Sequence, residues 1–239
     1  YSPQDLRGPS KIGDSVNTET QHGLGILALW NDCSAGQREL YESWYQTEHL
    51  HDRVSIAGFR LGRRHESVGS GPQFFTYYET DSDDVLFSPT YLEQLDNPSP
   101  LTREVMKSVF TNVSRTVCVC ARRVGNCRGS LVITARSAFG KPLEELCAVV
   151  DSVGQRSGVL RAELWVRSQL QSGQREDAAR REEQIRGRDT HIESCLVAHT
   201  TTMQSAQEIA NSLEQSGRPD DLIGIYRFLC ELHREDCRP

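Results

Sequence analysis

The sequence is short of the features that mark membrane, nucleic-acid and metal-binding proteins. No apolar run approaches the roughly 20 residues that a membrane-spanning helix needs, so no span and no membrane partner are expected. The 27 lysines and arginines are outnumbered by 33 aspartates and glutamates, which gives a net charge of −6. A nucleic-acid-binding protein usually presents a basic face, so a nucleic-acid partner is not expected either.

The eight cysteines form no ligand motif. No Cys-x-x-Cys pair occurs, and five of the cysteines fall within expected strands and helices, where a cysteine packs as a small apolar side chain. We therefore expect neither a metal site nor a disulfide framework, but reduced thiols in a cytoplasmic protein. No glycine-rich nucleotide-binding loop is present, and no cofactor is expected.

One order of elements occurs twice in the chain: strand, helix, strand, strand, helix, strand. In both copies the first helix ends at a glycine, Gly58 or Gly158, that leads into the second strand. Continuous or alternating apolar residues predict the strands, and apolar residues three to five apart predict the helices. Ser34 is the expected N-cap of the first helix. The expected ranges are 24–30, 35–54, 59–66, 73–79, 90–95, 101–109 and 114–122, then 130–135, 143–157, 159–168, 192–200, 205–215 and 223–232.

The first copy (residues 23–125) and the second (126–239) would each expose an apolar sheet face if they stood apart. We therefore expect the two sheets to pack face to face, with the helices outside, and to enclose a cavity within one chain. Residues 1–22 are polar and are expected to be a flexible arm. Residues 169–189 are rich in Arg, Glu and Gln and are expected to be a solvated hairpin extension, with an interaction arm as the alternative.

A motif near the end of the first helix carries a family resemblance. The segment 44–50, followed by Arg53, the segment 56–59 and the segment 63–65, resembles the EthD-like branch of the dimeric α+β barrel proteins. In that branch a helix ends in Trp-x-x-x-x-His, and a short glycine-containing loop leads into a strand. The resemblance implies an α+β fold of two ferredoxin-like βαββαβ repeats packed as a barrel. Because the superfamily includes monooxygenases, isomerases, polyketide cyclases and haem-binding proteins, it does not fix a reaction.

His49 is the first catalytic candidate. It lies near the C-terminal end of the expected helix, where the helix dipole favours a protonated imidazole. At the mouth of a cavity such a histidine can act as a general acid or base. Trp44, about one turn earlier, is expected to line the substrate site. A capping or packing role for His49 is the alternative.

Further candidates lie on the strands. Arg63 and His65 share one face of the strand 59–66, which we expect to look into the cavity together with Phe59 and Leu61. There Arg63 can bind an anionic group and His65 can contact the substrate. A surface salt-bridge network is the alternative for this pair.

The neighbours Tyr77 and Tyr78 point to opposite faces of their strand, so one of them can supply a phenol to the cavity. Tyr78 is the catalytic candidate and Tyr77 a substrate-binding one. Trp165 and His199 of the second copy are expected to contribute to substrate binding from across the barrel. A structural role is the alternative for each of these four residues.

The leading expectation is a cofactor-independent lyase or isomerase, acting as an isomerase, dehydratase or cyclase on an aromatic or polyketide-like molecule. His49 would move a proton, Arg63 would hold an anionic group and Tyr78 would stabilise an oxyanion. The alternatives are a non-catalytic small-ligand protein, a structural assembly protein and a haem-binding barrel. The resemblance would place a haem ligand in the second copy, whose first helix has no histidine. Edge strands would allow a homo-oligomer.

Overall fold

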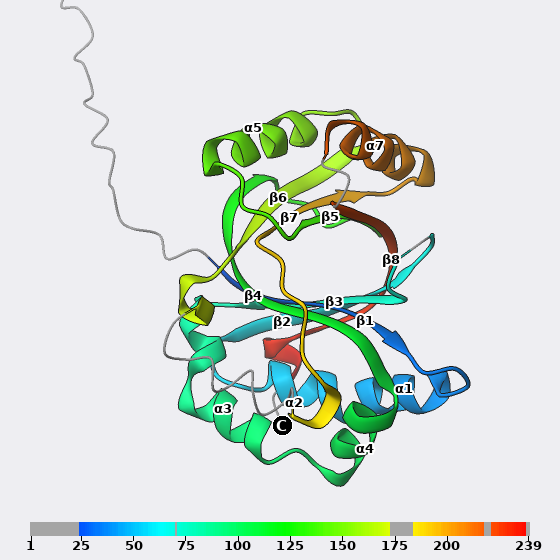
Figure 1. The fold of residues 1–239 in the computed structure, drawn as a ribbon, viewed down its shortest axis with the longest axis vertical. Coiled ribbons are helices and arrows are strands. Elements are labelled where there is room, and N and C mark those ends of the chain that lie inside the picture. Colours follow the sequence, from blue (N-terminus) through cyan, green and yellow to red (C-terminus); the bar gives the residue numbers. More distant parts are fainter. Residues whose placement is uncertain (1–23, 70, 173–183, 218–220, 238–239) are drawn as a thin grey trace, which may run out of the picture.

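The computed structural model describes residues 24–69, 71–172, 184–217 and 221–237 of the chain. In these residues eight strands close into one barrel, in the order β1-β3-β2-β8-β5-β7-β6-β4. Figure 1 shows this closed ring of strands, with helices outside it on two opposite sides. The α+β barrel class is confirmed. The expected arm (1–22) and the middle of the charged extension (173–183) lie outside the described residues.

Each half of the chain contributes four strands in the same spatial order. The first half gives β4-β1-β3-β2 and the second gives β8-β5-β7-β6, which is the expected ferredoxin-like order. The halves join where β2 pairs with β8 and where β4 pairs with β6, and all the pairings are antiparallel. The strands are β1 Gly25–Cys33, β2 Phe59–Ser67, β3 Phe74–Thr80, β4 Phe110–Gly125, β5 Leu131–Ser137, β6 Val159–Arg167, β7 Ser194–Thr200 and β8 Leu222–His233.

The helices cover the outer faces of the two sheets (Figure 1). Three of them begin where the sequence supplies a cap: the side chains of Ser88, Ser99 and Thr202 each accept a hydrogen bond from the backbone N–H three residues on. The first sheet is covered by α1 Arg38–Trp44, a π-helix Tyr45–His49, α2 Leu50–Val54, a 3₁₀ turn Asp83–Phe87, α3 Pro89–Asp96 and α4 Pro100–Ser108. The second is covered by α5 Leu143–Gly154 and α7 Met203–Ser216, and 3₁₀ turns follow β6 at Gln169–Ser172 and β8 at Arg234–Cys237.

The first helix differs from the expectation at its start. It begins at Arg38 and not near residue 35, and Ser34 does not cap it. The hydroxyl of Ser34 donates instead to the carbonyl of Ser108, at the end of α4, over 2.9 Å. The side chain of Ser34 therefore makes a tertiary hydrogen bond and does not cap the helix that follows it in the sequence.

The second strands of the two halves carry the same irregularity. The pairing register shifts between Phe59 and Leu61 in β2 and between Val159 and Arg161 in β6. Because side chains alternate along a strand, the shift turns Phe59 to the outer face, although we expected it on the inner face with Leu61. The inner face of β2 therefore begins at Leu61.

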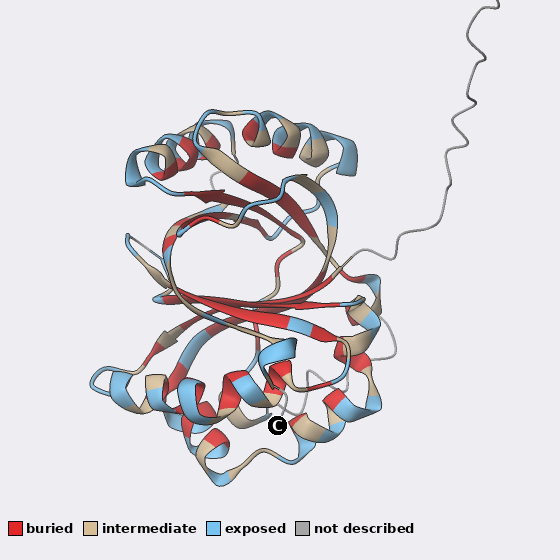
Figure 2. Ribbon diagram, turned by 180° about the vertical axis from the view of Figure 1, so that it is seen from behind, coloured by how far each residue is buried: buried red, intermediate tan, exposed pale blue. Residues whose placement is uncertain are grey.

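Buried side chains form three clusters (Figure 2 shows buried residues along the strands and on the inner sides of the helices). One lies between the first sheet and its helices, one inside the barrel, and one between the second sheet and α5 and α7. Side chains of all the strands fill the barrel, and the two sheets thus share one interior. The expected packing of sheet against sheet is confirmed.

Among the residues that the structure describes, packed side chains occupy the centre of the barrel, where we expected an open cavity. Six large inner side chains expose 0% of their surface, so no void the size of a water molecule lies against them. Ring contacts explain the filling, because aromatic side chains from β1, β2, β3 and β6 meet there. The six side chains are Trp30, His65, Phe75, Tyr77, Trp165 and His199.

Candidate functional site

A network of buried charges occupies one end of the barrel. Glu79, near the end of β3, accepts from Arg161 at the start of β6 over 3.3 Å and from Arg128 over 2.6 Å. Arg161 also pairs with Glu163 at 2.6 Å, and Arg123 of β4 completes the network on Glu163. The carboxylate of Glu163 is fully buried, so its two arginines are what makes its charge tolerable there.

Arg63 on β2 links the two halves at this end. Its guanidinium donates to the carboxylate of Glu231 on β8 over 3.1 Å and to the carbonyl of Gly129 over 2.9 Å. It also lies 4.4 Å from the ring centre of Phe228. Arg63 points inward as expected, and its side chain is buried, whereas the carboxylate side chain of its partner Glu231 is 32% exposed.

His65 is inside the barrel with both ring nitrogens engaged. Its Nδ1 donates to the carbonyl of Phe75 over 3.2 Å, because a carbonyl can only accept, and its Nε2 accepts from Nε of Arg63 over 3.3 Å. Burial lowers the pKa of His65 to about 3, and the charge of Arg63 adds to this effect. The imidazole is therefore neutral, and its hydrogen bonds fix one tautomer.

His199 on β7 contrasts with His65. It exposes 0% of its surface, and neither ring nitrogen has a hydrogen-bond partner among the described residues. Burial holds the pKa of His199 well below its usual value, and His65, Arg63, Arg161 and Arg128 lower it further. A neutral imidazole with both nitrogens free lies beside guanidinium groups, which is an arrangement suited to receiving a polar ligand.

Aromatic rings form the wall between the two ends of the barrel. Trp30 stacks on Phe75 at 4.9 Å between ring centres, and Trp165 lies edge-on to Tyr77 at 5.1 Å. The indole nitrogens of both tryptophans have no hydrogen-bond partner in the described part of the chain. Burial raises the pKa of Tyr77 above its usual value, so its phenol stays protonated at neutral pH.

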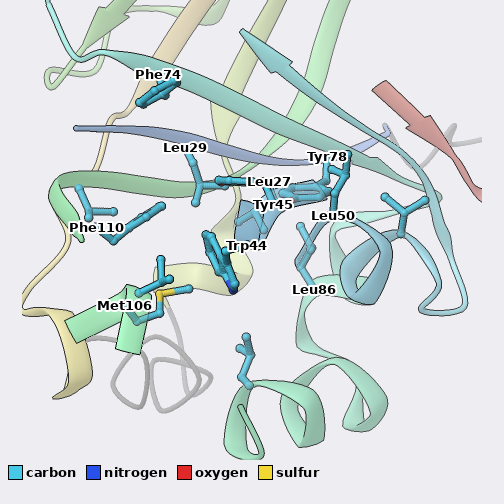
Figure 3. Packing of buried hydrophobic residues seen from close by; sticks show 14 of the residues in the cluster. Leu27, Leu29, Trp44, Tyr45, Leu50, Phe74, Tyr78, Leu86, Met106 and Phe110 are labelled. Atoms are coloured by element: carbon cyan, nitrogen blue, oxygen red, sulfur yellow. The ribbon is translucent and has the colours of Figure 1, made fainter. Parts of the chain in front are cut away.

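The Trp44 and His49 pair lies outside the barrel, between the first sheet and its helices. The two rings stack at 4.0 Å, and Trp44 Nε1 donates to the hydroxyl of Thr102 over 2.9 Å. A π-helix joins residues five apart, so the π-helix Tyr45–His49 places this Trp-x-x-x-x-His pair on one side. Figure 3 shows Trp44 and Tyr45 among the apolar side chains of this layer.

Tyr78 belongs to the same outer layer (Figure 3), and its ring lies edge-on to that of Phe59, with 5.9 Å between the ring centres. The three side chains expected to act together therefore do not share one site. Arg63 points into the barrel, whereas His49 and Tyr78 lie on the other side of the first sheet, because alternate residues of a strand face opposite sides. The structure instead brings Arg63, His65, Tyr77, Trp165 and His199 into the barrel.

Several arginines of the barrel were not among the candidates from the sequence, and Arg128 and Arg136 illustrate why. Arg128 lies in the connection between β4 and β5, which has no periodicity from which its inward direction could be inferred. Arg136 lies on β5, and its alternation with Val132 and Thr134 was a usable signal for an inward side chain.

The described residues at two candidate places do not fit a haem group. A cavity of about 410 Å³ lies between α5, α7 and the outer face of the second sheet. Its described lining includes Leu146, Leu164 and Lys141 but no His, Cys, Tyr or Met, and hence no side chain to ligate the iron. Within the barrel, His199 meets packed side chains and not a wide apolar cavity.

The described residues also lack two other features. No group of three or more His, Cys, Asp or Glu side chains among them is placed to hold a metal ion. No helix among them has the length and apolar character to cross a membrane.

Comparison with known proteins places the fold. No protein-family model matches the sequence, and no curated protein matches it. A solved structure titled an anthrone oxidase-like protein matches with a TM-score of 0.58 and 12% identity, over 89% of this chain and 94% of that one. A putative monooxygenase from Fusobacterium nucleatum subsp. nucleatum matches with a TM-score of 0.50 and 8% identity, over 89% and 95%. A putative chlorite dismutase matches with a TM-score of 0.50 and 9% identity, over 90% and 97%.

The chain shares the closed α+β barrel fold of these structures. Identities this low show the fold alone, and the particular likeness to the EthD-like branch stays a prediction. The described residues of this one chain supply both four-stranded halves of the barrel.

Proposed function

We propose that the protein is a small-molecule enzyme whose reaction takes place inside the barrel, with His199 as the group that moves a proton. The observation that carries the proposal is the imidazole of His199, fully buried and without a partner at either nitrogen among the described residues. Leaving a buried polar group unpaired costs about 1–3 kcal/mol, so a ligand that pairs with it gains affinity from that contact.

The lining favours an aromatic or polyketide-like ligand. Flat rings of Trp30, Phe75, Tyr77 and Trp165 offer stacking surfaces, while the unpaired indole nitrogens can donate to ligand oxygens. Because these side chains fill the barrel, a ligand can enter only as some of the rings move aside. Binding is therefore expected to change the fluorescence of Trp30 and Trp165.

The charge distribution supports proton abstraction. His199 is neutral and accepts a proton from an acidic C–H or O–H of the ligand, and the oxyanion that forms is stabilised by Arg63 and Arg161. Burial holds the pKa of His199 low in the free protein, and the neighbouring arginines lower it further. The negative charge that develops on the ligand offsets their field and raises that pKa, so the imidazole becomes a stronger base as the reaction proceeds.

This chemistry is the first step of a cofactor-independent isomerisation, dehydration or cyclisation. The titles of two structural neighbours, anthrone oxidase-like protein and putative monooxygenase, support a small-molecule reaction in this fold. A cytoplasmic setting is part of the proposal, and the eight free thiols support it. A role for His49 in this reaction is not proposed, because it lies on the other side of the sheet.

The test is exchange of acidic ligand protons with solvent deuterium, followed by NMR, with anthrone as the probe. The wild-type protein should accelerate the exchange, and His199→Gln should slow it by about 100-fold or more, the usual contribution of general acid–base catalysis. His51→Gln, the same change at an exposed position of α2, is the matched control and should match the wild type. Equal rates for His199→Gln and wild type would refute the role of His199.

A non-catalytic ligand-binding protein is the second candidate, and the filled barrel favours it, since a carrier needs only that the rings open and close. In that case anthrone changes the tryptophan fluorescence of the wild type, but exchange proceeds no faster than in buffer. The two measurements together separate an enzyme from a carrier.

A further inference from the structure

Arg136 on β5 is an exception among the buried arginines. It exposes 7% of its surface, yet it makes no hydrogen bond and no ion pair with any residue that the structure describes. Every other buried arginine in the described part has a polar partner. These pairs are Arg53 with Gln94, Arg63 with Glu231, Arg64 with Glu42, Arg115 with Tyr91, and Arg161 with Glu163.

The surroundings of Arg136 supply a surface but no negative charge. Its guanidinium lies 4.8 Å from the ring centre of Trp30, which stacks in turn on Phe75. The titratable groups that face it are the phenol of Tyr226 and the thiol of Cys195, and burial raises the pKa of each to about 12. Both groups are therefore neutral, and the positive charge of Arg136 is uncompensated.

Several buried polar groups around Arg136 can donate a hydrogen bond but have no partner among the described residues. Arg136 Nε, Trp30 Nε1 and the Tyr226 hydroxyl are buried and have no partner in the described residues. An arginine and an indole can only donate, so another donor cannot satisfy them. An anionic ligand would accept hydrogen bonds from these unpaired donors and would compensate the unpaired positive charge.

The position of Arg136 also suits a ligand that reaches His199. Arg136 pairs in the sheet with Cys195, and His199 lies four residues further along the same strand, β7. At about 3.3 Å per residue, the two ends are roughly 13 Å apart. At the end near His199 the arginines that would stabilise a developing oxyanion are in ion pairs with Glu79, Glu163 and Glu231, whereas Arg136 has no ion pair and is available to a permanent charge of the ligand.

We propose that Arg136 binds the carboxylate of a small aromatic acid whose ring packs against Trp30. This inference names the ligand class of the barrel site and rests on the proposed function in assuming that the ligand enters the barrel. The planar guanidinium donates two parallel hydrogen bonds to the carboxylate, and Trp30 and Tyr226 supply further donors. Among Trp30, Phe75, Cys195, Tyr226 and Arg136, only Arg136 has solvent contact, which makes it the first of these groups that an entering anion meets.

The experiment compares 2-naphthoate with its neutral analogue 2-naphthamide by isothermal titration calorimetry at constant ionic strength. The wild type should bind the anion at least tenfold more tightly than the amide. Arg136→Met, which keeps the length of the side chain, should lose at least tenfold in affinity for 2-naphthoate and keep its affinity for the amide. Arg60→Met, at an exposed position of β2, is the matched control and should behave as the wild type.

Two results would overturn the inference: an Arg136→Met variant that binds 2-naphthoate within twofold of the wild type, or a wild type that shows no preference for the anion. Folding of the variant is not in doubt on physical grounds, because removing an unpaired buried charge should leave the melting temperature unchanged or raise it. The wild type gives a second reading, since 2-naphthoate should raise its melting temperature more than the amide does.

Failure of this inference and failure of the proposed function can be told apart. His199→Gln should keep the affinity for 2-naphthoate, because the carboxylate lies on Arg136. If His199→Gln leaves proton exchange unchanged while Arg136→Met loses the anion, the catalytic proposal fails and the anion site stands. If proton exchange depends on His199 but the preference for the anion does not depend on Arg136, the catalytic proposal stands and the anion site fails.

Discussion

Replacing Glu163 by glutamine tests how much the buried charge network stabilises the fold. The change keeps the shape of the side chain and removes one negative charge that is 0% exposed and lies 2.6 Å from Arg161. Removing one partner of a buried ion pair costs about 3–5 kcal/mol, because the other charge stays buried. Arg161 keeps Glu79 at 3.3 Å, and Arg123 is partly exposed and can turn to solvent. We therefore expect the lower end of that range, about 3 kcal/mol.

Urea unfolding followed by circular dichroism measures the free energy of unfolding, and a loss of about 3 kcal/mol corresponds to a melting temperature lower by roughly 6–12 °C in a chain of this size. The matched control is Asp81→Asn, which breaks the Arg60–Asp81 pair. That pair has the same 2.6 Å separation, but its side chains are 51% and 60% exposed. An exposed pair contributes about 0–1 kcal/mol. Equal losses in the two variants would refute the reasoning, because burial would then not decide the cost.

Three further predictions address other parts of the molecule. Gly58→Ala should lower the free energy of unfolding by about 1–2 kcal/mol, because Gly58 has a φ of 89°, which an alanine adopts only with strain. Gly140→Ala, at a position where φ is not positive, should change it little, and urea unfolding compares the two variants. Burial lowers the pKa of His65 to about 3, well below that of a histidine in the unfolded chain, so His65 is neutral in the folded state and its protonation favours unfolding. The free energy of unfolding should therefore fall as the pH drops from about 6.5 towards 3. A His65→Gln variant should lose less stability over that range. Trp44→Phe should cost about 1–3 kcal/mol by removing the donor to Thr102, and an unchanged melting temperature would contradict that contact.

The order of strands and helices could be predicted because it depends on periodicity. Apolar alternation located β5, β6 and β7, and Trp165, which we expected to face across the barrel, lies on the inner face of β6. The face of Phe59 could not be predicted, since it depends on a register shift that pairing with β3 imposes. Periodicity describes one strand, whereas a bulge belongs to a pair of strands.

The site could be predicted only in part, for two physical reasons. The Trp44 and His49 motif reads as an α-helical pair near a cavity, but a π-helix brings the rings together on the outer layer. The filling of the barrel depends on the summed volumes of side chains from all eight strands, which no local pattern contains. For the same reason the missing partner of Arg136 is visible only once the strands that surround it are in place.

The matched registers of the two halves have a consequence for symmetry. Gly25 pairs with Thr80 as Leu131 pairs with Thr200, so each inner position of the first half has an equivalent in the second. By this correspondence Trp30 is equivalent to Arg136, and in the structure these two side chains touch each other across the pseudo-twofold axis.

The same correspondence makes Arg63 equivalent to Glu163, and Glu79 equivalent to His199. Two identical subunits related by a twofold axis would have to place the same residue at both equivalent positions, arginine with arginine and glutamate with glutamate. A barrel formed by one continuous chain is free of that constraint, and its equivalent positions carry different chemistry. Trp30 and Arg136 are a ring and a cation, and Arg63 and Glu163 are a cation and an anion. The connection between β4 and β5 is thus what allows this interior to be chemically polarised from one side to the other.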